Sequence, residues 1–126
     1  MTDCILTFGS NCQERERMMD IAAKWIDSTF GIAVSSGVYS TQALNGKSPD
    51  YLNMVVRVVT GLSAEQLINL GKEFERRCGR LPESKLTGIV EMDVDLVRYG
   101  NVVLRPEEFT RAYFMTGYEK ILAKKL

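Results

Sequence analysis

Glu91-Met92-Asp93-Val94-Asp95-Leu96-Val97 is the stretch that decides the fold, because its acidic and apolar residues alternate with a period of two. Such alternation is typical of a β-strand, whose successive side chains point to opposite faces of a sheet. The apolar side chains can pack into a core, whereas the carboxylates of Asp93 and Asp95 repel one another at a spacing of about 6.6 Å. Two interpretations stay open: a solvent-exposed acidic face, or a site for a divalent cation that also takes phosphate ligands.

The segments around this stretch alternate between strand and helix patterns. β-branched or alternating residues that predict strands occupy 3–8, 32–40, 51–60 and 91–99. Apolar residues recur at helical spacing up to Thr29 in a first helix and up to Cys78 in a second. Ser10 with Gln13, or Asn11 with Glu14, has capping-box spacing at the start of the first helix, and Ser63 with Gln66 at the start of the second. A last helical region follows Pro106 and is expected to break near Gly117.

The order strand, helix, strand, strand, helix, strand predicts an α+β fold of the ferredoxin-like βαββαβ type with a helical C-terminal tail. We expect an antiparallel-containing sheet with both long helices on one face and the other face free for a ligand. The length of 126 residues suits one domain, covering residues 1–126.

The composition excludes several functions. With 16 basic and 16 acidic residues the net charge is zero, which argues against a general binder of nucleic acid or membrane surfaces. Histidine is absent, which removes histidine-based catalysis and histidine metal ligands. The chain has no apolar run long enough to span a membrane and no signal-peptide pattern at its start. The three cysteines are widely spaced and lack zinc-ligand spacing, so the expected location of the protein is the reducing cytoplasm.

Short motifs follow one another in a fixed order along residues 5–121. They are Gly9-Ser10-Asn11, Ser35-Ser36-x-x-Tyr39-x-Thr41, Pro49-Asp50-Tyr51-Leu52-Asn53, Leu62-Ser63 with Glu65 and Leu67, Glu75, Gly79-Arg80, Asp93-Val94-Asp95-Leu96, Tyr99-Gly100 and Arg111-Ala112-Tyr113. As an ordered set they resemble the 6-hydroxymethyl-7,8-dihydropterin pyrophosphokinase family of folate biosynthesis. The resemblance implies a ferredoxin-like transferase that moves the terminal diphosphate of ATP to the hydroxymethyl group of the pterin and releases AMP.

The resemblance also implies a role for each matching residue. Asp93 and Asp95 would hold two Mg²⁺ ions between the ATP phosphates and the pterin hydroxyl, an arrangement that suits displacement at phosphorus. The pterin would be bound by Thr41, Leu44, Tyr51, Asn53 and Tyr113. The nucleotide would be bound by Glu75, Arg80, Lys85 and Arg111, of which Arg80 and Arg111 would also be catalytic, because a guanidinium matches phosphate geometry.

Purely structural roles stay open for most of these residues. Tyr51 can anchor a strand end, Asn53 can be a strand-edge or turn residue, and Glu75 can be an exposed helix acid. Arg80 can pair with the C-terminal end of a helix dipole. Arg111 can belong to a surface ion pair.

The sequence also departs from the family. Leu86 to Glu91 stands where the family has Arg-Trp-Gly-Pro-Arg-Thr, and of that motif only Gly88 is kept. Pro82 replaces an arginine, the Pro-His element is absent, and a shortened C-terminal end is expected. These losses leave open a catalytically reduced paralogue that binds pterin or a similar ligand without diphosphate transfer, or a ferredoxin-like domain that meets a protein partner. The expected partners are therefore the small molecules pterin and ATP, and the sequence does not identify a protein partner.

Overall fold

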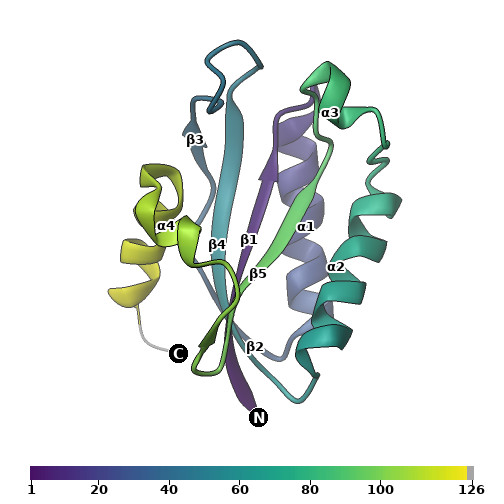
Figure 1. The fold of residues 1–126 in the computed structure, drawn as a ribbon. Coiled ribbons are helices and arrows are strands. Elements are labelled where there is room, and N and C mark those ends of the chain that lie inside the picture. The colour runs from purple at the N-terminus through teal and green to yellow at the C-terminus, as the bar shows by residue number, and fades with distance from the viewer. Residues whose placement is uncertain (125–126) are drawn as a thin grey trace.

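A single antiparallel sheet organises the chain, with helices on both of its faces (Figure 1). The computed structural model describes residues 1–124, apart from the side chains of Ser84 and Lys85. Within this range the sheet has six strands in the order β2-β4-β1-β5-β6, and β3 also pairs with β4. The strands are β1 (Thr2–Ser10), β2 (Ile32–Ser35), β3 (Tyr39–Thr41), β4 (Tyr51–Thr60), β5 (Asp93–Tyr99) and β6 (Val102–Val103). The predicted α+β fold is confirmed.

Two long helices cover one face of the sheet, as the sequence predicts. They are α1 (Arg15–Thr29) and α2 (Ala64–Arg77). The predicted capping box is present at the start of α2, where Ser63 and Gln66 exchange side-chain and backbone hydrogen bonds. Between the two helices, the ring of Trp25 stacks on that of Phe74 with centroids 4.5 Å apart. This contact makes Trp25 a packing residue of the helix layer.

The strand β5 has the alternation that its sequence predicts. Leu96, like Met92 just before the strand, is buried in the core beneath α1 and α2. Asp93 and Asp95 point to the opposite face, where they pair in register with Gly9 and Thr7 of the central strand β1. The acidic row therefore lies over the middle of the sheet.

The second face is not free, contrary to expectation, because the C-terminal segment packs on half of it. The 3-10 helix η1 (Pro106–Thr110) leads into α4 (Ala112–Leu122), as Figure 1 shows beside β3 and β4. Phe114 and Ile121 of this segment form a second buried cluster with apolar residues of the sheet, among them Ile5, Val55 and Val97. Hydrophobic burial thus fixes the tail and leaves only the other half of this face for a ligand.

The expected break at Gly117 is also wrong. The helix α4 runs through Gly117 without interruption, and the change of direction lies at Arg111, between η1 and α4. At Gly117 a Cβ atom would lie 2.5 Å from the Tyr39 hydroxyl and 2.5 Å from Val55 Cγ2. Glycine is therefore present because the helix approaches the sheet closely.

The start of α1 differs from the predicted capping box. The residue that precedes the helix is Glu14, and no side chain caps the helix end. The buried side chain of Asn11 instead donates to the Gly88 carbonyl over 2.7 Å and accepts from the Val90 amide over 2.6 Å. Asn11 thus holds the segment after the short helix α3 (Ser84–Thr87) against the end of β1.

The predicted second strand is divided into β2 and β3. Between them, the Ser36 hydroxyl accepts the Val55 amide and donates to the Gly37 carbonyl, and Gly37 has a positive φ of 80°. At this point the Ser36 hydroxyl, and not a backbone carbonyl, accepts the hydrogen bond of the Val55 amide. In residues 1–124 no helix combines the length and apolar character needed to cross a membrane.

Candidate functional site

A cavity of about 430 Å³ opens on the second face of the sheet, beside the half that α4 covers. Most of the sequence-predicted site residues line it: Thr41, Leu44, Tyr51, Asn53, Arg80, Asp93, Asp95, Arg111 and Tyr113. Glu75 is not in the cavity wall and lies behind Arg80. Lys85 was predicted to bind nucleotide, and its side chain lies outside the described residues. Elements far apart in sequence therefore converge on one site.

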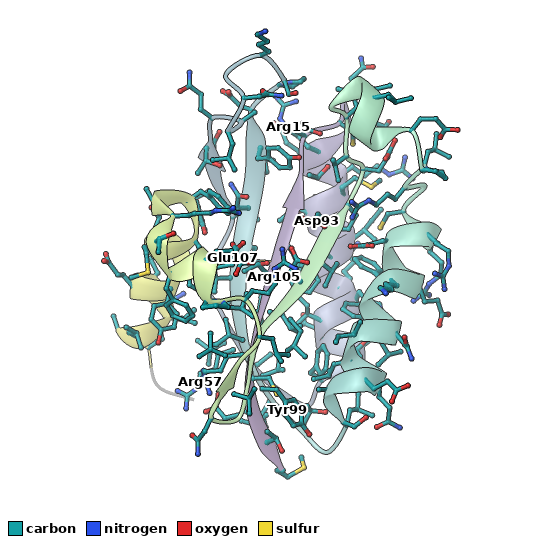
Figure 2. The ribbon with its side chains drawn as sticks, viewed as in Figure 1. Arg15, Arg57, Asp93, Tyr99, Arg105 and Glu107 are labelled. Atoms are coloured by element: carbon teal, nitrogen blue, oxygen red, sulfur yellow. The ribbon has the colours of Figure 1, made fainter. Side chains whose placement is uncertain are left out.

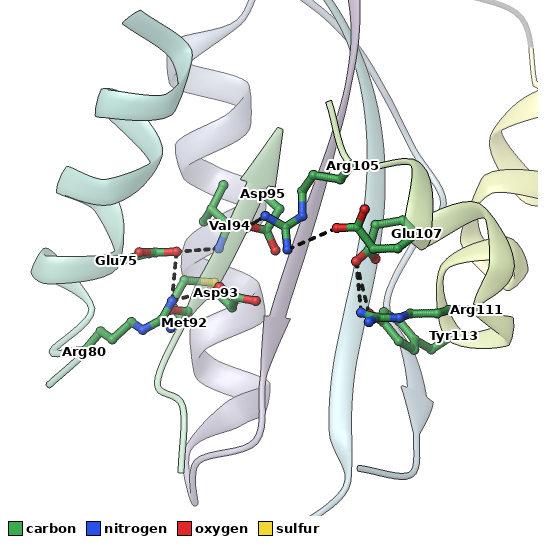
Figure 3. Close-up of polar contacts among 11 residues, drawn as sticks. Glu75, Arg80, Met92, Asp93, Val94, Asp95, Arg105, Glu107, Arg111 and Tyr113 are labelled. Atoms are coloured by element: carbon green, nitrogen blue, oxygen red, sulfur yellow. Dashed lines mark hydrogen bonds and ion pairs between the residues drawn. The ribbon is translucent and has the colours of Figure 1, made fainter. Parts of the chain in front are cut away.

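Asp93 is held by a cation from the end of α2. Arg80 Nη1 donates to Asp93 Oδ1 over 2.8 Å and lies 3.0 Å from Glu75 Oε2 (Figure 3). Glu75 Oε2 also accepts the amide of Val94 over 2.7 Å. Glu75 is therefore a half-buried residue that positions Arg80 and β5, and burial raises the pKa of its carboxyl.

Asp95 is the more perturbed of the two aspartates. Burial, followed by the nearby charge of Asp93, raises the pKa of Asp95 to about 7. The only described cation in ion-pair contact with it is Arg105, whose Nη1 lies 3.6 Å from Asp95 Oδ1 and whose Nη2 lies 3.7 Å from Glu107. Figure 2 shows Arg105 and Glu107 close together over the middle of the sheet. The sequence prediction missed Arg105, which follows β6 and carries no motif.

The aspartate pair suits a magnesium ion whose remaining ligands are phosphate oxygens and water. Among the residues whose side chains are described, no group of three or more histidine, cysteine or acidic residues is arranged to hold a metal. Two carboxylates are the usual protein contribution to Mg²⁺, the rest coming from substrate phosphates and water. Burial and the nearby charge of Asp93 disfavour the ionised form of Asp95. A cation bound between the two carboxylates would stabilise that form.

The other end of the cavity is aromatic and amide-lined. Asn53 Nδ2 donates to Thr41 Oγ1 over 2.6 Å, and the half-buried ring of Tyr51 lies beside it. A Cβ atom at Gly9 would lie 3.4 Å from Asn53 Oδ1 and 3.5 Å from the Tyr51 ring. The absence of a side chain at Gly9 therefore keeps the space next to these groups open.

Arg111 and Tyr113 contact each other on the wall that η1 and α4 form. Arg111 Nη1 donates to the Tyr113 hydroxyl over 2.8 Å and to Glu108 Oε1 over 3.2 Å. Figure 3 shows this pair across the sheet from Asp93 and Asp95. Glu108 also lines the cavity, and the sequence does not identify it, because an acidic residue soon after Pro106 is ordinary at the N-terminal end of a helix.

The comparison with known proteins agrees with this geometry. The model of the 7,8-dihydro-6-hydroxymethylpterin-pyrophosphokinase family matches residues 5–123, which is nearly the whole chain. The chain belongs to this family. In this pterin pyrophosphokinase family member, one cavity is lined by the acidic side chains of Asp93 and Asp95 and by the aromatic side chains of Tyr51 and Tyr113.

Curated relatives of this pyrophosphokinase family member are similar at low identity. The 2-amino-4-hydroxy-6-hydroxymethyldihydropteridine pyrophosphokinase of Haemophilus influenzae is 26% identical over 117 residues, which are 90% of this chain and 72% of the relative. The folate synthesis bifunctional protein of Arabidopsis thaliana is 29% identical over 101 residues, covering 78% of this chain and 21% of the relative. The folic acid synthesis protein fol1 of Schizosaccharomyces pombe is 30% identical over 108 residues, covering 83% of this chain and 15% of the relative. The chain thus spans only a small part of the last two.

Proposed function

We propose that this family member transfers the terminal diphosphate of ATP to 6-hydroxymethyl-7,8-dihydropterin. The observation that carries the proposal is that the aspartate pair and the Tyr51–Asn53 wall open into the same cavity of about 430 Å³. Clefts of roughly 300–1,000 Å³ are typical of small-molecule sites. The family match and the names of the relatives support the choice of substrates.

We assign the metal and phosphate end of the site to β5 and its neighbouring arginines. Asp93 and Asp95 would hold Mg²⁺, which when bound supplies positive charge to the ATP phosphates. Arg80 and Arg105 already lie beside these aspartates and can turn their guanidinium groups to the phosphates. Because Glu75 binds both Arg80 and the Val94 amide, it fixes the position of this arginine.

We assign the pterin end to the opposite wall. Asn53 and Thr41 offer hydrogen-bonding groups next to Leu44, and a flat heterocycle needs such groups along its edge. Tyr51 and Tyr113 supply aromatic faces, against which a ring packs best in an offset or edge-on arrangement. This division leaves the hydroxymethyl group of the pterin facing the acidic end.

The test is a product assay. The protein is incubated with ATP, MgCl₂ and 6-hydroxymethyl-7,8-dihydropterin, and AMP and the pterin diphosphate are separated by chromatography. We expect equal amounts of both products, formed only when Mg²⁺ is present and lost in the Asp95→Asn variant. Absence of AMP above the no-pterin background would contradict the proposal.

A second candidate is a pterin binder that does not transfer diphosphate. It is favoured by the ion pairs at the acidic end of the cavity, in which Arg80 and Arg105 each contact an aspartate of β5. Guanidinium groups engaged in this way are less available for phosphate. Calorimetry with the pterin and with a non-hydrolysable ATP analogue separates the two candidates, since a binder of this kind takes up pterin alone.

A further inference from the structure

Glu108 is a buried carboxylate in the cavity wall, on the side opposite to the acidic strand. Only 3% of its surface is exposed, although it belongs to the short helix η1. A carboxylate in such a position is costly unless it is paired and hydrogen-bonded. Its partners therefore indicate why the chain keeps an acid there.

The partners of Glu108 are the two site residues Arg111 and Tyr113. Glu108 Oε1 lies 3.2 Å from Arg111 Nη1 and accepts a hydrogen bond from the Tyr113 hydroxyl over 3.3 Å. Arg111 and Tyr113 contact each other over 2.8 Å, so the three polar groups form a closed triangle. The Arg111 guanidinium carbon also lies 5.9 Å from the centroid of the Tyr113 ring.

The triangle fixes the junction between η1 and α4. Glu108 lies in η1, Arg111 at the change of direction, and Tyr113 in the first turn of α4. The backbone of Tyr113 is held separately, because its carbonyl accepts the Tyr39 hydroxyl over 2.6 Å. Glu108 therefore acts on the ring and hydroxyl of Tyr113 and on the direction of the Arg111 guanidinium. Buried hydrogen-bond networks of this kind make side-chain positions rigid.

We infer that Glu108 is a positioning residue of the pterin end: it orients the Tyr113 ring toward the bound heterocycle and keeps Arg111 beside that ring. The inference rests on the proposed function, because it takes pterin as the ligand of this wall. It concerns the pterin and not the nucleotide, since the nucleotide end is built by Arg80, Arg105 and the aspartates.

The test compares four single variants of the full chain and one double variant, which combines Glu108→Ala with Tyr113→Phe. Glu108→Ala removes both the charge and the acceptor, and Glu108→Gln keeps an acceptor oxygen. Tyr113→Phe removes the hydroxyl and keeps the ring, and Glu119→Gln is the matched control on the exposed side of α4. For each protein we would measure the thermal unfolding midpoint, the calorimetric Kd for the pterin and for a non-hydrolysable ATP analogue, and kcat and KM for each substrate.

We expect Glu108→Ala to raise the pterin Kd and KM about tenfold, the effect of losing roughly 1.4 kcal/mol, with the ATP-analogue Kd within twofold of wild type. Glu108→Gln should restore most of the pterin affinity. The double variant Glu108→Ala/Tyr113→Phe should lose less pterin-binding free energy than the sum of the losses in the two single variants, because the residues act as one unit. A residue that only stabilised the fold would lower the unfolding midpoint without this selective change in the pterin KM.

The outcomes separate the inference from the proposed function. If wild type binds no pterin, the proposed function fails and the inference fails with it. If wild type binds pterin and folded Glu108→Gln, Glu108→Ala and Tyr113→Phe bind it equally well, only the inference fails. The same holds if the ATP-analogue Kd rises while the pterin Kd stays constant. Should Glu108→Ala not fold, Tyr113→Phe decides alone, because loss of the hydroxyl breaks the same contact.

Discussion

Arg80 and Asp93 form a hydrogen-bonded ion pair, with Nη1 2.8 Å from Oδ1. The same nitrogen lies 3.0 Å from Glu75, so one guanidinium group joins two acids from different elements. One of the two proposed metal ligands is thus already bound to a cation. If Asp93 binds Mg²⁺ as proposed, the ion has to compete with Arg80 for this carboxylate.

Replacement of Arg80 separates its effect on the metal from its effect on the nucleotide. In Arg80→Ala, Mg²⁺ alone should bind a few-fold more tightly, because Asp93 loses its competing cation. An ATP analogue with Mg²⁺ should bind about tenfold more weakly, since a charge-assisted hydrogen bond contributes roughly 1.5–3 kcal/mol. Calorimetry measures both, with Arg17→Ala on the exposed side of α1 as the control. Unchanged Mg²⁺ affinity would show that the Arg80 contact does not restrict access to Asp93.

Asp95 should make the folded state less stable as the pH rises. Its pKa is about 7 in the folded chain and about 3.9 in an unfolded one, so the folded state binds more protons between these values. The free energy of unfolding should therefore fall from pH 4 to pH 7, by on the order of 1–2 kcal/mol once partial exposure is allowed for. Urea unfolding across this range should show a smaller decrease in Asp95→Asn, and that variant should be the more stable protein at pH 8. If wild type and Asp95→Asn show the same pH dependence of the free energy of unfolding, Asp95 does not have a raised pKa in the folded chain.

The periodic parts of the chain are the parts that its sequence predicts well. Strand alternation places Met92 and Asp93 on opposite faces, and the capping box at Ser63 marks the start of α2, because both features depend on neighbouring residues only. The family motifs likewise identify much of the cavity wall. These predictions need no knowledge of how distant segments pack.

The incorrect predictions concern residues whose partners are distant in sequence. Asn11 has the spacing of a helix cap, yet its side chain binds a segment that lies 77 to 79 positions away. Gly117 has the composition of a helix break, yet it marks a close contact with Tyr39. Arg105 reaches Asp95 only after the chain turns back through β6, and no local pattern identifies that contact. Glu108 is the exception, because Arg111 lies only three positions away and what the sequence does not show is the burial of this carboxylate.

Asn11 should control the order of the segment that borders the cavity. Asn11→Ala leaves the Val90 amide and the Gly88 carbonyl without this partner, at a cost of about 2–4 kcal/mol for the two groups. Because Gly88 and Val90 line the cavity, ligand affinity should fall as well. Hydrogen exchange at residues 88–90 should accelerate more than exchange in α2. The control is Asn101→Ala in the exposed turn after β5, which should leave both quantities near wild type.

Gly117 should tolerate no side chain, even though glycine is a poor residue for a helix interior. Alanine would improve the helix by roughly 1 kcal/mol, but its Cβ would lie 2.5 Å from Val55 Cγ2 and from the Tyr39 hydroxyl. Neither neighbour can yield easily, because Val55 is β-branched on a buried strand and the Tyr39 hydroxyl is bonded to the Tyr113 carbonyl. We therefore expect Gly117→Ala to lower the free energy of unfolding by about 2 kcal/mol, within the usual range for overpacking.

The matched control is Gly71→Ala in α2, where the helix gain is the same and the closest atom, Val94 Cγ1, lies 3.2 Å from the new Cβ. That neighbour has to move by only a few tenths of an ångström, so the change in stability should be much smaller than at Gly117. Denaturant unfolding of both variants measures the difference directly. Because the shift at Gly117 would move α4 and with it Tyr113, the pterin Kd should rise in Gly117→Ala and stay constant in Gly71→Ala. Equal stability of the two variants would mean that α4 can move away from the sheet without loss.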